Sequence, residues 1–190
     1  MILRELRPTV SLVVFFTIAL GFIVPGLFTG AAQVALPYQA NGSLIVKNGQ
    51  AVGSALIGQN FTGPLWFTPR PSVLDSPYDS STSGASNLAP TSAALLTTIQ
   101  QRVAAYLKAY GPGVVPADAV TSSASGLDPD ISLENALRQA PAIAQARHLP
   151  AAAVTALVQA QAHLPALGLI GTAHVNVLQL NLALDGLSSP

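Results

Sequence analysis

Serine and histidine are the side chains of this sequence that come nearest to a catalytic set. Ser125 lies in the run Ser123-Ala-Ser-Gly, which resembles half of the Gly-x-Ser-x-Gly elbow that exposes a serine nucleophile. A hydrolase also needs a histidine base that is oriented by an acidic residue. The histidines are scattered, at His148, His163 and His174. Since such histidines are ordinarily surface or capping residues, we expect no catalytic residue in this chain.

Metal and phosphate sites are not indicated either. The sequence has no cysteine, which excludes disulfides, zinc-thiolate sites and thiol catalysis. Asp128-x-Asp130 is too short for a calcium loop and more often accepts hydrogen bonds from backbone amides before a helix. No Gly-x-x-x-x-Gly-Lys-Ser/Thr loop is present to hold phosphates. The chain is therefore expected to bind no metal and to have no cofactor of its own.

Charged residues are scarce. They make up 8% of the chain, and the formal net charge is +0, whereas soluble proteins usually have about 25% charged residues. Such a surface cannot attract nucleic acid strongly. Either other proteins cover much of the surface, or the composition reflects a genome biased toward alanine codons. Arg70, in a long loop, is interpreted either as a buried side chain that bonds carbonyl groups or as a recognition residue.

The strongest signal for an element is an uncharged, apolar stretch from Val10 to Phe28. A helix needs roughly 20 apolar residues to cross a bilayer. Residues 8–30 are therefore predicted to form a single transmembrane helix. A signal peptide cleaved near Gly30-Ala31-Ala32 is the alternative, but its apolar region would normally be shorter.

Two arginines give this helix an orientation. Arg4 and Arg7 precede it, and no further charge occurs until Lys47. Basic residues flanking a transmembrane helix tend to stay in the cytoplasm. Residues 1–7 are thus expected in the cytoplasm, and residues 31–190 are expected to form one soluble extracytoplasmic domain.

The remaining sequence predicts a mixture of strands and helices. Apolar spacing, capping residues and glycine or proline stops set their limits, and Asn48-Gly49 is a hairpin turn signal. In the first half of the chain we expect a linker over 30–41, a hairpin over 43–57, an ordered loop over 58–90 and a helix over 91–110. A short turn over 116–120 follows, and then a helix over 132–148 that is kinked or divided at Pro141. The last elements are a helix over 150–163 and a strand over 175–184, which Asn176, Gln179 and Asn181 interrupt. Strands around a block of helices indicate an α+β domain.

Several short motifs occur in a fixed order along the chain. They are residues 53–61 (GSALIGQNF), 70–72 (RPS), 83–88 (SGASNL), 115–116 (VP), 120–121 (VT), 125–128 (SGLD) and 175–185 (VNVLQLNLALD). In this order and spacing the set resembles the C subunit of the Kdp potassium-transporting ATPase, a bacterial P-type pump. The resemblance covers essentially the whole chain, including the apolar N-terminal helix.

This resemblance implies a non-catalytic accessory subunit of a high-affinity potassium uptake pump in the bacterial inner membrane. Its partners would be a channel-like potassium-binding subunit and a subunit that hydrolyses ATP, so ATP and K+ would be handled by the complex. The family's C subunit is described as needed for assembly and as a catalytic chaperone that raises the ATP affinity of the pump subunit. A glutamine implicated in that effect corresponds to Gln139. Ala142 and Gln145 stand where the family usually has basic residues, and only Arg147 remains.

Two sets of residues are expected to contact the partners. Fixed polar groups and aromatic residues occur together in the loops of a charge-poor domain, and the predicted docking residues are Arg70, Pro71, Ser72, Ser86, Asn87, Ser125, Gly126, Asp128 and Asn176. Small residues of the membrane helix would allow close helix packing, with lipid around the rest; they are Thr17, Gly21, Gly26 and Gly30. The alternative to a pump subunit is a membrane-anchored extracytoplasmic enzyme or binding protein that acts alone.

Overall fold

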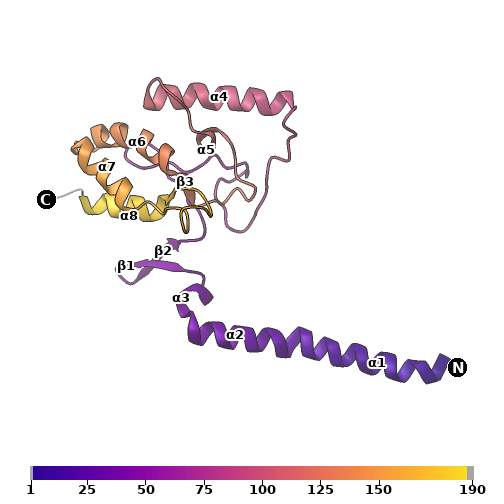
Figure 1. The fold of residues 1–190 in the computed structure, drawn as a ribbon. Helices are drawn as coiled ribbons and strands as arrows, with labels where there is room; N and C mark the ends of the chain where they lie inside the picture. Colours follow the sequence, from indigo (N-terminus) through magenta and orange to yellow (C-terminus); the bar gives the residue numbers. More distant parts are fainter. Residues whose placement is uncertain (1, 188–190) are drawn as a thin grey trace. The chain divides into compact units, whose positions relative to one another are not determined.

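The computed structural model of the chain describes residues 2–187. It divides into two compact units, residues 1–45 and residues 46–190. The first is mainly helical, and the second mixes helices with short strands (Figure 1). One long apolar N-terminal helix followed by a mixed region confirms the predicted α+β class.

The N-terminal unit consists mainly of one long apolar helix. Its parts follow without a break: α1 (Ile2–Ile18), a π-helical segment (Ala19–Ile23) and α2 (Val24–Ala35). The helix over Arg4–Ala35 has 32 residues, its most apolar 18-residue window has a mean hydropathy of 2.4, and its apolar side chains are exposed. It is long and apolar enough to cross a membrane.

The linker predicted over residues 30–41 is wrong. The helix continues to Ala35, and one further turn, α3 (Pro37–Ala40), follows Leu36. Alanine-rich sequence favours the helix up to Ala35. Pro37 disfavours helical backbone in the residue before it, and Leu36 has φ −137° and ψ 56°. A proline therefore ends this helix.

The π-helical turn has a local cause in Pro25. Proline has no N–H, and its ring clashes with the carbonyl of the preceding turn, so the helix widens there. The N–H of Val24 accordingly donates to the carbonyl of Ala19 and passes over the usual partner at Leu20. The wider turn also changes the angle around the helix axis between Gly21 and Gly26, two of the predicted packing residues.

A β-hairpin comes next, and it confirms the prediction. β1 (Leu44–Lys47) and β2 (Gln50–Ser54) form a two-stranded sheet. Asn48 and Gly49 in the turn have φ of 54° and 77°, which a tight hairpin turn requires. Residues 55–92, all of them described, then form turns and bends in place of helices or strands. The long loop expected over residues 58–90 is thus confirmed.

The predicted helices are present. They are α4 (Ala93–Tyr110), α5 (Ala117–Val120), α6 (Leu133–Ala146) and α7 (Ala151–Ala160). Ser92 and Ser132 cap α4 and α6, because each hydroxyl accepts a hydrogen bond from the backbone N–H three residues later. Pro141 does not divide α6, which runs through it as one helix.

The strand predicted over residues 175–184 is wrong for most of its length. Only β4 (His174–Asn176) is extended; it pairs antiparallel with β3 (Asp130–Ser132), with Val175 opposite Ile131. The chain then forms α8 (Val177–Leu187). The Asn176 side chain accepts from the N–H of Gln179 at 3.1 Å and so caps α8. From there the apolar residues bury a helical stripe, not a strand face.

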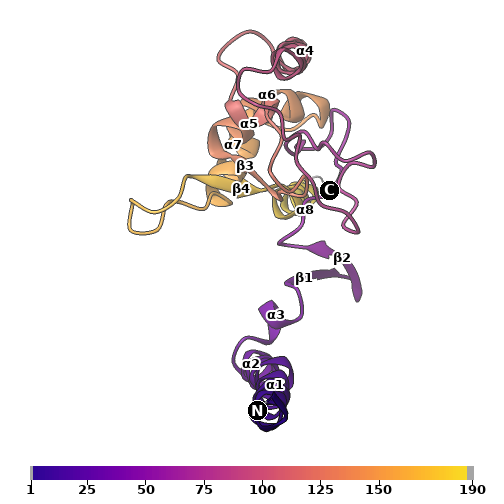
Figure 2. The same ribbon diagram turned by 90° about the vertical axis from the view of Figure 1, so that its right-hand side faces the viewer.

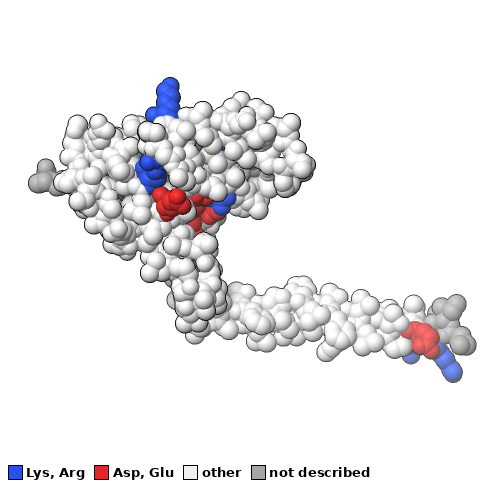
Figure 3. Space-filling view, turned by 45° about the horizontal axis from the view of Figure 1, so that its top comes forward, with Lys and Arg blue, Asp and Glu red and all other residues white. Residues whose placement is uncertain are grey.

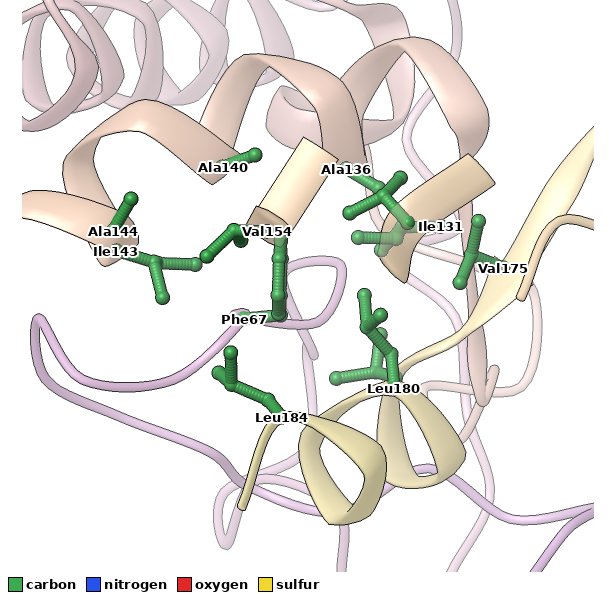
Figure 4. Close-up of a cluster of buried hydrophobic side chains, with 12 residues drawn as sticks. Phe67, Ile131, Ala136, Ala140, Ile143, Ala144, Val154, Val175, Leu180 and Leu184 are labelled. Carbon is green, nitrogen blue, oxygen red and sulfur yellow. The ribbon is translucent and has the colours of Figure 1, made fainter. Parts of the chain in front are cut away.

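Phe67 connects the long loop to the core. Its ring is fully buried, with 0% of its surface exposed, among side chains of α6, α7, α8 and both strands of the second sheet (Figure 4). The cluster is made up of Phe67, Ile131, Ala136, Ala140, Ile143, Ala144, Val154, Val158, Val175, Val177, Leu180 and Leu184. Because an aromatic ring of the loop fills the centre, the loop belongs to the folded core.

Candidate functional site

Gln139 of α6 is buried, with 1% of its surface exposed, and is engaged by internal hydrogen bonds. Its Oε1 accepts from the backbone N–H of Thr68 at 2.8 Å and from the Thr68 hydroxyl at 3.2 Å. Its Nε2 donates to the Thr68 carbonyl at 3.1 Å and to Oδ1 of Asn135 at 3.0 Å. The amide therefore pairs with the backbone of the long loop much as a neighbouring strand would.

Asn181 of α8 holds the adjacent loop residue in the same way. Its Oδ1 accepts from the N–H of Phe67 at 2.8 Å, and its Nδ2 donates to the Phe67 carbonyl at 2.9 Å. Gln139 and Asn181 together form an amide clamp that fixes residues 67–68 between two helices. Asn181 is not among the predicted site residues, although a polar side chain within an apolar run is a signal for it.

A chain of polar groups links this amide clamp to the start of α6. Oδ1 of Asn135 also accepts from the Tyr106 hydroxyl at 2.9 Å, and its Nδ2 donates to Asp118 at 3.0 Å. Asp118 in turn accepts from the N–H of Ser132 at 2.8 Å and from its hydroxyl at 2.9 Å. Burial raises the pKa of Tyr106, so its hydroxyl keeps the proton that it donates. Helices α4, α5 and α6 are thereby tied to the amide clamp.

Residues 123–128 form a loop hub on which the predicted docking motifs meet. The Ser123 hydroxyl accepts from the N–H of Gly126 at 2.9 Å, which shapes the turn. The Gly126 carbonyl accepts from the Ser72 hydroxyl at 2.9 Å, and the Ser125 carbonyl accepts from the N–H of Gly84 at 2.9 Å. Gly126 has φ 71°, and a Cβ on it would lie 2.9 Å from Cγ of Leu74. Only glycine fits there.

Arg70 lies inside this arrangement. Its Nη1 donates to Oδ2 of Asp128 at 2.7 Å, with 23% of the arginine side chain and 27% of the aspartate side chain exposed. Its Nη2 donates to the Ser122 carbonyl at 3.4 Å. The Tyr78 hydroxyl donates to the Arg70 carbonyl at 2.7 Å, and burial raises the pKa of Tyr78. Of the two interpretations of Arg70, the geometry favours the internal one.

The other arginines of this unit also donate to backbone carbonyls. Arg102 donates to Val120 at 3.0 Å, Arg138 to Gly111 at 2.7 Å and Arg147 to Leu65 at 2.6 Å. Arg147 also pairs with Asp185 at 3.2 Å and lies 4.4 Å from the centre of the Trp66 ring. Little charge is left to face outward, and most of the face drawn in Figure 3 carries none.

The serine and histidine residues considered for catalysis are not assembled into a triad. Ser125 accepts from the N–H of Leu127 at 3.1 Å and lies 3.5 Å from the Ser123 hydroxyl. His174 stacks on His163, with ring centres 5.3 Å apart. Among the described residues, no hydrogen bond joins Ser125 to a histidine, and no cluster of three or more His, Cys, Asp or Glu that could hold a metal occurs.

The remaining predicted docking residues differ in exposure. Ser86 and Asn87 are exposed, whereas Pro71 is half-buried beside Arg70 in a shallow hollow of the surface. Asn176 is buried, because its Nδ2 donates to the Ala55 carbonyl at 2.9 Å and to Asp130 at 3.2 Å. The structure thus brings the loop motifs together and leaves only some of their side chains accessible.

The predicted packing residues of the membrane helix lie open. A Cβ on Gly21, Gly26 or Gly30 would meet nothing within 4 Å. Thr17 and Gly21 line a shallow apolar hollow together with Leu20. Close approach of another helix along this side is sterically allowed.

A helix able to cross a membrane, followed by an α+β domain whose loops are fixed by buried amides and arginines, defines a membrane-anchored domain with a rigid, charge-poor surface. The family described as "KdpC: K+-transporting ATPase, c chain" matches residues 6–186. The chain belongs to this KdpC family, and it is an accessory subunit of a potassium-transporting ATPase.

Relatives from several bacteria agree with this assignment. The "Potassium-transporting ATPase KdpC subunit" of Allorhizobium ampelinum is 52% identical over 184 residues, which cover 96% of each chain. Proteins of the same name are 51% identical over 190 residues in Caulobacter vibrioides, covering 99% of this chain and 96% of its own, and 50% identical over 183 residues in Acidobacterium capsulatum, covering 96% and 98%. Such likeness along nearly the full length favours a pump subunit over an enzyme that acts alone.

Proposed function

We propose that the soluble domain is a rigid docking module outside the membrane, which assembles the pump and couples its subunits without a nucleotide site of its own. The observation that carries this proposal is the internal engagement of Gln139 and of the arginines. A triphosphate is held by cationic side chains or by backbone N–H groups that face it. Residues that already bond loop carbonyls are poorly placed for that task.

The orientation of the membrane helix supports the same function. Arg4 and Arg7 at its start favour a cytoplasmic N-terminus. The domain would then lie across the inner membrane from cytoplasmic ATP. Gln139 would affect ATP affinity only through the complex, by favouring one conformational state by about 1–3 kcal/mol. The chaperone effect described for the family is, in this proposal, a coupling effect.

The partners follow from the same proposal. The domain docks on the channel-like subunit near the potassium entrance, and the membrane helix packs against that subunit through its small residues. ATP is hydrolysed by a separate P-type subunit, and K+ is carried by the channel-like one. The docked surface is charge-poor, as the centres of protein interfaces are.

A reporter fusion tests the orientation. A reporter that is active only outside the cytoplasm, fused after Pro190, should work, and one that is active only in the cytoplasm should be silent. Moving Arg4 and Arg7 to the other end of the helix serves as the control and should weaken or invert the result. A cytoplasmically active fusion on the native sequence would contradict the proposal.

A further inference from the structure

Residues 163–174 form a hairpin finger that continues from the β3–β4 sheet. His163 and His174 exchange backbone hydrogen bonds of 2.8 and 3.1 Å, and Ala166 and Ile170 exchange bonds of 2.9 and 3.0 Å. The second arm leads into β4, where Val175 is fully buried. Figure 2 shows this segment running outward from β4, beyond the helices of the domain. The finger therefore has a fixed base and a free tip.

The tip of the finger is apolar and exposed. The exposed fractions are 73% for Leu164, 90% for Leu167, 87% for Leu169 and 68% for Ile170. No charged residue occurs between Arg147 and Asp185 to solubilise it. Monomeric soluble proteins rarely expose large apolar side chains together, and such patches mark binding sites.

The backbone of the tip gives a second, independent indication. Leu167 has φ 55° and is followed by Gly168 with φ 71°. Asparagine or glycine adopts such a turn more readily than leucine does, and either would be more soluble. Strained backbone of this kind clusters at functional sites. A leucine that is both strained and exposed is explained if its side chain is used in binding.

The composition of the finger distinguishes protein from lipid as its occupant. Segments that lie in a membrane interface carry Trp or Tyr anchors and Lys or Arg beside their apolar residues. Residues 163–174 contain none of these. The centres of protein interfaces, by contrast, are apolar and depleted of charge.

We infer that the finger inserts its leucine-rich tip into an apolar groove of a partner protein subunit of the same pump. This inference rests on the chain's role as a pump subunit and does not depend on which side of the membrane the domain occupies. The side chains that enter the groove are those of Leu164, Leu167, Leu169 and Ile170, while His163 and His174 remain at the base.

A single-cysteine label tests the inference, since the chain has no cysteine of its own. Leu169→Cys and, as a control, Val114→Cys, which is 78% exposed in another loop, are made in the full chain. In the chain alone both should react with a maleimide at similar rates. In the assembled complex, labelling at position 169 should be at least tenfold slower than at position 114. A benzophenone attached at 169 should cross-link this chain to another pump subunit.

Equal labelling of both positions in the assembled complex would overturn the inference. Cross-links to lipid only, or to a second copy of this chain, would overturn it as well. A full chain that never co-purifies with pump subunits would overturn both the subunit role and the inference about the finger. A chain that co-purifies but shows equal labelling would overturn only the inference about the finger.

Discussion

The burial of Gln139 argues against direct contact with nucleotide and in favour of an indirect effect on nucleotide binding. Gln139 is 1% exposed, and its amide bonds the backbone of Thr68. To contact a ligand, the Gln139 amide would have to break these hydrogen bonds and release the loop beside Phe67. An influence on a distant ATP site is therefore expected to come from the position of the loop that Gln139 holds.

Gln139→Ala is expected to lower the free energy of unfolding by roughly 2–3 kcal/mol, because it leaves the backbone N–H and carbonyl of Thr68 without their partner. Gln145→Ala is the matched control, since it changes an exposed glutamine of the same helix. Denaturant unfolding of the full chain in detergent measures both. Equal stability of the two variants would contradict the structural role of the amide clamp.

Asp130 provides a pH-dependent test in the β3–β4 sheet. Burial raises the pKa of its carboxyl above the ordinary 3.8, and the charge of Asp128 adds to this, whereas His174 opposes it. The folded state therefore holds this proton more tightly than the unfolded chain does. Stability from this group is present at low pH and falls as pH rises from about 3.8 through the raised pKa.

Asp130→Asn should consequently melt at a higher temperature than the native chain at pH 7. The amide is uncharged, and its oxygen can still accept from Nδ2 of Asn176. The gap between the two melting temperatures should narrow as pH falls toward 4. A difference in melting temperature that grows as pH falls would show that the folded state favours the charged form of Asp130. Asp75→Asn, at an exposed carboxylate of the long loop, controls for general charge effects.

Among the elements, helices with clear caps are predictable from the sequence, and α8 shows where this fails. Ser92 and Ser132 stand directly before periodic apolar residues, so α4 and α6 are found almost to the residue. Asn176 caps α8 in the same way, but the apolar run after it also resembles a buried strand. Interpreting Asn176 as an N-cap, like Ser92 and Ser132, would have indicated the helix.

The amide clamp itself is beyond sequence reasoning. Gln139 and Thr68 are 71 positions apart, and Asn181 and Phe67 are 114 positions apart. No local pattern relates residues so distant along the chain. The loop motifs at residues 70–72 and 125–128 are predicted to contact partner subunits, and the hydrogen bonds that join them to each other were not foreseen.

The loop hub leads to a prediction about docking. Arg70→Ala removes the support of the long loop and should reduce recovery of pump subunits with this chain several-fold. Ser86→Glu should do the same by placing a charge on the exposed docking motif, without altering the fold. Lys108→Ala, on the exposed side of α4, is the control and should leave recovery unchanged. Equal co-purification of all three variants would show that the loops have only a structural role.

For the whole molecule, we propose that a charge-poor domain, which follows one helix able to cross a membrane, affects ATP use only through its partners. The arginines of the domain donate to the Asp128 carboxylate and to backbone carbonyls of the domain itself. Arginines that are engaged in this way are poorly placed to hold phosphate groups. The isolated chain is therefore expected to have no specific ATP site.

Calorimetric titration of ATP into the purified full chain in detergent measures this binding. We expect at most millimolar, non-specific binding, a free energy of about 4 kcal/mol, with no difference between the native chain and Gln139→Ala at a temperature where both are folded. Micromolar ATP binding that Gln139→Ala abolishes would show instead that the chain has a nucleotide site of its own.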